Sequence, residues 1–167
     1  HKNHKNLLIA FKLLIDRYSF DGQLVFSGIA MQGHNEIIAE IENLGLAESV
    51  KILGYLPSEE LPCLYNLARL MVFPSLFEGF GIPLVEAMAC GCPVVCSDAT
   101  SMPEVVGNAG ITFDPLSPED VAEKIWSVWN DDSQIEQMKK TGRERVELFN
   151  WECAARKTIE VYAKAIA

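Results

Sequence analysis

The chain has 167 residues, of which 49% are hydrophobic and 22% are charged. This composition allows a full hydrophobic core and excludes a disordered segment, and the length suits one domain. The net charge of −9 disfavours nucleic acid or an anionic membrane surface as the main partner. It does not disfavour an anionic small ligand, because a few backbone amides and one lysine can bind a phosphate. We expect neither a membrane span nor a signal peptide.

Apolar periodicity and turn residues predict helices and strands in alternation. The predicted helices cover residues 6–18, 34–44, 58–68, 83–91, 101–107, 118–129, 133–149 and 152–165. The predicted strands cover residues 23–26, 50–53, 70–73, 93–97 and 111–113. Ser58 and Ser117 are expected N-caps, Pro62 is tolerated in a first helical turn, and Gly45 is an expected C-cap.

This alternation predicts the α/β class, a Rossmann-like parallel sheet with helices on both faces. Ligands of such folds bind at the carboxyl ends of the strands. The candidate site residues therefore follow the strands, at 27–28, 54–56, 75–82 and 97–100. An α/β domain that begins with a helix lacks a strand before it, so we expect a first strand upstream of residue 1.

The stretch 73–95, FPSLFEGFGIPLVEAMACGCPVV, reads as strand, glycine loop, helix and strand. Gly79 and Gly81 allow a tight turn, and the amides near Ile82 and Leu84 begin the helix, where a phosphate is favoured. A plain turn between strand and helix remains an alternative for this loop.

Two carboxylates, Glu78 and Glu86, bracket the loop. Glu86 can accept two hydrogen bonds from a vicinal diol such as a ribose, and Glu78 can accept from sugar hydroxyls. Amides for phosphates and carboxylates for hydroxyls together predict a nucleotide-sugar site. Glu86 could instead serve only the helix dipole.

Cysteine and histidine patterns predict no metal cofactor. Most of the five cysteines lie among apolar residues and are expected to be reduced core thiols, which fits a cytosolic setting. His1 and His4 have no carboxylate or cysteine partner at metal-ligand spacing.

The run from Glu78 to Glu86, continued by EAMACGCPVV, resembles the E-x7-E signature of the retaining GT-B glycosyltransferases of family 4, also called glycosyl transferases group 1. Further similarity covers residues 102–107, 113–115 and 52–54 and the opening Lys2-Asn3-His4. These matches span nearly the whole chain, and the mannosyltransferase-like branch is the most similar.

The resemblance implies a role for each matching residue. Glu78 would hold sugar hydroxyls and Lys2, with Lys5 as runner-up, would neutralise the diphosphate. The amides of Phe80 and Gly81 would also contact the sugar, and the amides near Ile82 and Leu84 would bind the diphosphate. Glu86 would bind the ribose, and Leu61 would pack against the nucleoside. The backbone of Gly54, Tyr55 and Leu56 would contact the base, and Gly28 would leave space beside the donor. Glu104 also matches a family position, although a helix cap or ion pair would explain it.

The resemblance also implies that the chain is the donor-binding C-terminal half of a two-domain enzyme. An N-terminal acceptor domain would complete it, and the last helix would partly return towards that half. The implied reaction transfers a sugar, with mannose as the implied choice, from a GDP- or UDP-linked donor to an acceptor hydroxyl. It would proceed with retention and without a metal, in polysaccharide or glycolipid synthesis. Little or no transfer is expected from this chain alone.

We expect a cytoplasmic enzyme that can associate peripherally with the inner face of a membrane through the acceptor half. Two alternatives stay open: a GT-B-like nucleotide-sugar epimerase or hydrolase, and a non-catalytic nucleotide-binding module. A glycosidase built on two catalytic carboxylates is disfavoured, because a phosphate-binding loop between them would have no purpose.

Overall fold

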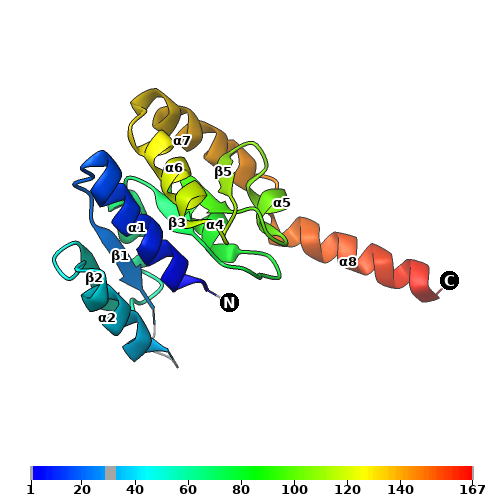
Figure 1. Ribbon diagram of the computed structural model, residues 1–167. Coiled ribbons are helices and arrows are strands. Elements are labelled where there is room, and N and C mark those ends of the chain that lie inside the picture. The colour runs from blue at the N-terminus through cyan, green and yellow to red at the C-terminus, as the bar shows by residue number, and fades with distance from the viewer. Residues whose placement is uncertain (1, 29–32, 167) are drawn as a thin grey trace.

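The computed structural model describes residues 2–28 and 33–166, in which helices and strands alternate (Figure 1). The strands are β1 (Leu24–Ser27), β2 (Val50–Gly54), β3 (Met71–Phe73), β4 (Val94–Ser97) and β5 (Gly110–Phe113). The helices are α1 (His4–Tyr18), α2 (His34–Asn43), α3 (Leu61–Leu67), α4 (Ile82–Ala89), α5 (Met102–Val106), α6 (Pro118–Trp129), α7 (Asp132–Val146) and α8 (Trp151–Ile166). His1 lies outside the described residues.

All strand pairs are parallel, which confirms the α/β class. The strands form two groups, β1–β2 and β3–β4–β5. Within the described residues, β1 and β3 each have one edge with no paired strand. The helix α1 bridges the two groups, because its buried side chains share one core with residues of both.

Helices cover both faces of the three-stranded sheet β3–β4–β5, as the sequence predicts. Side chains of a strand point alternately to its two faces. On β4, Val95 joins a core with α1, α6 and α7, whereas Val94 and Cys96 join a second core with α4 and α5. Each face of the central strand is therefore sealed by apolar helix residues.

The predicted start of α3 at Ser58 is wrong. The helix begins at Leu61, and residues 58–60 form a turn in which Glu60 N–H donates to Pro57 O at 3.0 Å. A proline ring clashes with the carbonyl of the preceding helical turn, so a helix can begin just before Pro62 but not a full turn earlier. By contrast, Ser117 caps α6 as predicted, accepting from Asp120 N–H at 3.2 Å.

The expectation that most cysteines are core thiols holds for only two of them. Cys92 and Cys96 are buried, and burial raises the pKa of each thiol to about 12. Cys63 is exposed, and Cys90 and Cys153 are partly exposed. All five are free thiols.

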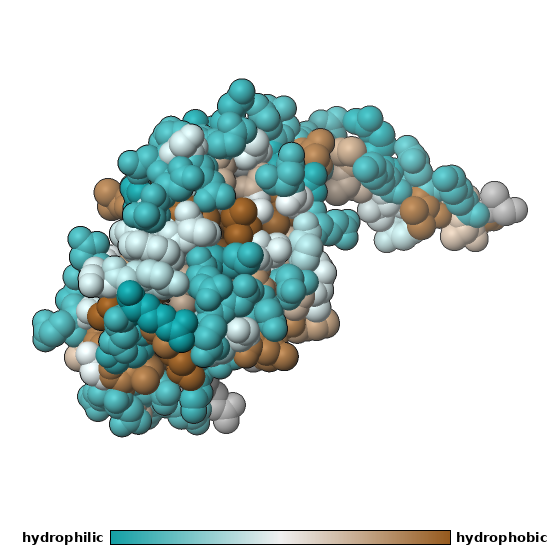
Figure 2. All heavy atoms as spheres, turned by 45° about the horizontal axis from the view of Figure 1, so that its top comes forward, coloured by the Kyte–Doolittle hydropathy of each residue, from teal (hydrophilic) through white to brown (hydrophobic). Residues whose placement is uncertain are grey.

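The last helix, α8, extends away from the rest of the molecule (Figure 1). None of its side chains is buried, and large apolar groups remain exposed on it: Trp151, Ile159, Val161, Tyr162 and Ile166. Figure 2 shows this helix as an arm with both hydrophobic and hydrophilic side chains. In the described part of the chain, no helix combines the length and apolar character needed to cross a membrane.

Candidate functional site

The loops that follow β1 and β2 meet at the carboxyl edge of the sheet. Gly28 N–H donates to Gly54 O at 2.8 Å. Both glycines have positive φ, 145° and 73°, a backbone region that a side chain disfavours. Tyr55 is exposed beside them, while Leu56 and Leu61 are partly exposed. These predicted base contacts thus line one part of the edge.

Lys2 and Glu78 lie together at the same edge, although 76 residues separate them. Lys2 Nζ donates to Glu78 Oε1 at 2.7 Å and lies 5.3 Å from the centre of the Phe73 ring. Partial burial acts to raise the pKa of Glu78, but the hydrogen bond and charge of Lys2 outweigh it and hold the pKa below its ordinary value. Because its pKa is lowered, the Glu78 carboxylate is ionised at neutral pH. Its side chain is 19% exposed and therefore remains accessible.

Two asparagines fix the segment that carries Lys2. Asn3 and Asn6 both donate their side-chain amides to Pro115 O, at 2.7 and 3.0 Å. Asn3 has a left-handed backbone (φ 58°), which asparagine tolerates better than most residues. Lys2 is therefore anchored to the loop after β5, a contact that sequence reasoning missed.

Hydroxyl groups from the loop after β4 hold the glycine loop. Ser101 Oγ lies 3.0 Å from both Glu78 O and Phe80 O, and Thr100 Oγ1 accepts from Glu78 N–H at 3.2 Å. Thr100 has φ 53°, an unfavourable conformation for a β-branched residue. A strained residue against the glycine loop is a signal that only the backbone geometry reveals.

Three successive backbone amides remain free at the start of α4. The N–H groups of Phe80, Gly81 and Ile82 donate to no other residue in the described ranges. Leu84 N–H already donates to Gly81 O at 2.9 Å, and the Leu84 side chain is fully buried. An anion at this helix end would meet the first three amides rather than that of Leu84.

Glu86 is exposed on α4 and is not alone. Tyr65 Oη donates to Glu86 Oε2 at 3.2 Å. Burial, together with the charge and hydrogen bond of Glu86, raises the pKa of Tyr65. Tyr65 was not among the sequence-predicted site residues, because its apolar neighbours on α3 identify it only as a packing residue.

Ser75 lies next to the Glu78 carboxylate. Its hydroxyl helps to lower the pKa of Glu78, which favours the ionised carboxylate. The same hydroxyl is fully buried, and its geometry to the described residues does not complete a normal hydrogen bond. Buried hydroxyl groups without a partner are rare and mark places where a water or ligand atom can be accommodated.

Comparison with known proteins identifies the family. Residues 1–145 match the model of "Glycosyl transferases group 1". The chain belongs to this family. It is 40% identical to the O-antigen chain mannosyltransferase B of Escherichia coli over 162 residues, which cover 96% of this chain and 42% of that protein. It is also 40% identical to an MMP alpha-(1->4)-mannosyltransferase of Mycolicibacterium hassiacum over 131 residues, 76% of this chain and 32% of that protein.

Solved structures of glycosyltransferases have the same fold. A sucrose-phosphate synthase from Thermosynechococcus elongatus superposes with a TM-score of 0.85 and 28% identity, covering 99% of this chain and 42% of that one. The C-terminal domain of a group 1 glycosyl transferase from Francisella tularensis gives a TM-score of 0.77 and 25% identity, over 89% of this chain and 79% of that one. The present chain thus spans less than half the length of the curated relatives it matches.

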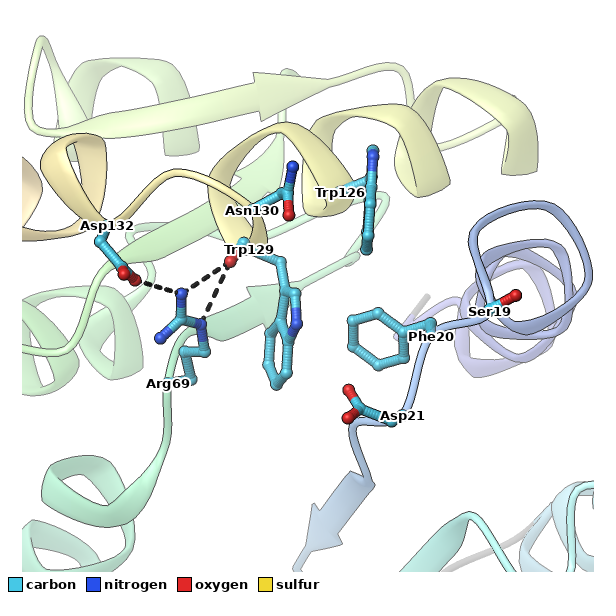
Figure 3. Close-up of a pocket in the computed structure, with 8 residues that line it drawn as sticks. All are labelled: Ser19, Phe20, Asp21, Arg69, Trp126, Trp129, Asn130 and Asp132. Atoms are coloured by element: carbon cyan, nitrogen blue, oxygen red, sulfur yellow. Dashed lines mark hydrogen bonds and ion pairs between the residues drawn. The ribbon is translucent and has the colours of Figure 1, made fainter.

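A hollow lies at the opposite, amino edge, where residues 19–21 precede β1 and Arg69 precedes β3 (Figure 3). Its volume is about 340 Å³, and it is lined by Ser19, Phe20, Asp21, Arg69, Trp126, Trp129, Asn130 and Asp132. Arg69 donates to Trp129 O through Nε and Nη2, at 3.2 and 2.7 Å, and to Asp132 at 2.6 Å. The guanidinium carbon of Arg69 lies 5.2 Å from the centre of the Trp129 ring, and the centres of the Trp129 and Phe20 rings are 4.5 Å apart. Across this hollow, Arg69 joins the segment before β3 to the end of α6 and to Asp132, and the Trp129 and Phe20 rings join the end of α6 to the segment before β1.

Proposed function

We propose that the chain is the donor-binding, C-terminal half of a retaining GT-B glycosyltransferase. The whole enzyme would transfer a sugar, mannose in our proposal, from a nucleotide-sugar to an acceptor hydroxyl in polysaccharide or glycolipid synthesis. The observation that carries this proposal is the meeting of Lys2, Glu78 and the free amides of residues 80–82 at the carboxyl edge. The names of the two mannosyltransferase relatives support the choice of sugar.

Each part of the edge suits one part of such a donor. The amides of Phe80 and Gly81 would help to hold the sugar, and the Ile82 amide at the N-terminus of α4 would bind the diphosphate. An ionised Glu78 would accept from sugar hydroxyls, and Glu86 from the ribose. The base would lie against residues 54–56 and Leu61, with Gly28 leaving space beside the donor.

Lys2 would assist the departure of the diphosphate. An ammonium group has three donors, and one of them is used by Glu78. The other two can reach a phosphate oxygen and neutralise the charge that develops there. We propose that this lysine and the helix N-terminus act in place of a metal. Among residues 2–28 and 33–166, no three His, Cys, Asp or Glu side chains cluster in a way that could hold a metal ion.

We propose that a strand upstream of α1 lies between β1 and β3. A strand, helix, strand unit with a short connection places its two strands side by side and parallel. The unpaired edges of β1 and β3, both packed under α1, offer backbone groups that such a strand would satisfy. The acceptor domain would precede this strand, and the apolar side of α8 would partly return towards it.

The cellular location and the macromolecular partners of the enzyme can also be proposed. We propose a cytoplasmic enzyme, at the inner face of a membrane if its acceptor is lipid-linked, with any membrane contact made by the acceptor half. The net charge of −9 disfavours nucleic acid as a partner.

Calorimetry with GDP, UDP and ADP tests donor binding. We expect one of these nucleotides to bind the whole polypeptide, and Glu86→Ala to weaken it about tenfold through loss of the ribose contacts. If none binds and Glu86→Ala changes nothing, the proposal is wrong. Hydrolysis of the nucleotide-sugar without transfer would favour an epimerase or hydrolase, and preference for a dinucleotide would favour a non-catalytic binding module.

Transfer itself requires the whole polypeptide. We expect sugar transfer from the nucleotide-sugar by the whole enzyme and little or none by residues 1–167 alone. Transfer by the short chain at a comparable rate would contradict the assignment of the acceptor site to a separate half.

A further inference from the structure

Tyr65 connects α3 to Glu86 on α4. Its ring is partly buried against the second hydrophobic core, together with Met71 and Val85. Its hydroxyl donates to Glu86 Oε2 at 3.2 Å, across 21 residues of sequence. The ring is thus held by packing and the hydroxyl is aimed at one oxygen of the carboxylate.

The phenol suits a permanent donor role. Burial raises the pKa of Tyr65, and the adjacent Glu86 charge raises it further, so the hydroxyl keeps its proton throughout the neutral range. Because Tyr65 uses one lone pair of Oε2, Glu86 keeps Oε1 and further lone pairs for a ligand. The contact therefore leaves the binding capacity of the carboxylate available.

We infer that Tyr65 is a positioning residue that holds the Glu86 carboxylate ready for the vicinal diol of a ribose. This inference rests on the proposed function, in which Glu86 accepts from the ribose hydroxyls. Glu86 is exposed, and an exposed glutamate samples several rotamers that it must give up when it binds. A hydrogen bond from a packed tyrosine restricts this freedom before the ligand arrives, which strengthens binding.

The alternative is that Tyr65 only packs between α3 and α4. Tyr65→Phe separates these roles, because it keeps the ring and removes the hydroxyl. Calorimetry in the whole polypeptide would compare GDP and UDP with their 2′,3′-dideoxy forms, which lack the diol. We expect Tyr65→Phe to weaken the affinity for the ribonucleotide about three- to tenfold, which corresponds to one net hydrogen bond. The affinity for the dideoxy form should stay unchanged.

A double-mutant cycle gives a second measurement. In a Glu86→Ala background, Tyr65→Phe should have no further effect on the ribonucleotide, because the group that it positions is gone. The matched control is Tyr18→Phe, whose ring stacks on Trp126 at the amino edge and whose hydroxyl loss should leave both affinities unchanged.

The outcomes distinguish this inference from the proposal it rests on. An equal loss for ribose and dideoxy forms, or no loss at all, overturns the role of Tyr65 while donor binding stands. An undiminished effect of Tyr65→Phe in the Glu86→Ala background overturns it as well. If the native protein binds no nucleotide, the proposed function falls and this inference falls with it.

Discussion

The two edges of the sheet differ in where their main hydrogen-bond donors are directed. At the amino edge, Arg69 makes three hydrogen bonds and contacts a tryptophan ring, all with residues of the same chain (Figure 3). At the carboxyl edge, the amides of Phe80, Gly81 and Ile82 have no acceptor in the described ranges. The donors of Arg69 are thus used within the chain, whereas the carboxyl edge keeps free donors beside an ionised carboxylate, and it is there that we propose the ligand binds.

Left-handed backbone occurs at both edges. Asn3 and Thr100 have positive φ beside the Lys2–Glu78 pair, and Ser19, which lines the hollow at the amino edge, has φ 52°. Such non-glycine residues cost stability and persist where the surrounding structure holds them. The edges differ in their polar groups instead: the carboxyl edge combines an ionised carboxylate with amides that have no acceptor in the described ranges, whereas the hydrogen bonds of Arg69 at the amino edge join secondary elements. Substitutions should consequently affect ligand binding at one edge and unfolding at the other.

Removal of the Lys2 ammonium should have the largest effect. We expect Lys2→Ala to lower kcat of the whole enzyme about 100-fold, because an uncompensated charge would develop on the leaving diphosphate. Steady-state kinetics would measure this. Lys5→Ala is the matched control, since Lys5 is a neighbouring exposed lysine and should change kcat less than about twofold. A larger loss for Lys5→Ala would assign the role to that residue instead.

Disruption of the amino edge should affect stability alone. Arg69→Ala removes two hydrogen bonds to Trp129 O, one to Asp132 and a ring contact. We expect the free energy of unfolding to fall by about 1–2 kcal/mol, with nucleotide affinity unchanged. Urea denaturation and calorimetry on the same samples would measure both. Weaker nucleotide binding by folded Arg69→Ala protein would contradict the division between the edges.

Loosening of the glycine loop should affect the sugar end of the donor. Ser101→Ala removes the hydroxyl that bonds Glu78 O and Phe80 O. We expect about three- to tenfold weaker binding of the nucleotide-sugar, and unchanged binding of the nucleoside diphosphate. Ser127→Ala is the control, because Ser127 also donates to a carbonyl, Lys124 O, but lies on α6. Equal losses for both ligands would show that Ser101 supports the whole site rather than the sugar end.

The smallest expected effect concerns pH. The folded pKa of Glu78 lies below its ordinary value of 4.5, so its pair with Lys2 stabilises the fold fully above that value. This contribution is lost as the pH falls through the folded pKa. Because Lys2 is 48% exposed, solvent screening limits it to about 0.5–1 kcal/mol.

Glu78→Gln should therefore lower the free energy of unfolding at neutral pH and flatten its decrease in acid. Urea titrations at neutral pH and below 4.5 would show this. Glu48→Gln, at an exposed carboxylate, should leave the acid dependence unchanged. An acid dependence in Glu78→Gln equal to that of the native protein would show that the pair contributes nothing.

Local signals in the sequence predicted most of the elements. Ser117 with Pro118 marked the start of α6, and Gly81 before Pro83 marked the start of α4, because capping and φ preferences act within a few residues. The same kind of signal failed at Ser58, where the ring of Pro62 prevented an earlier helix start. The Glu78 and Glu86 candidates also followed from local order, since both lie on one strand, loop and helix unit.

The sequence by itself determined the α/β alternation, the glycine loop and the two carboxylates, because each depends on neighbouring residues. Only the tertiary structure decided that Lys2 meets Glu78, that Ser101 holds the loop and that Tyr65 donates to Glu86. These contacts join residues 76, 23 and 21 positions apart. Local preferences cannot predict contacts between residues so far apart in the sequence. The contacts form only when parallel strands bring the segments that follow them close together.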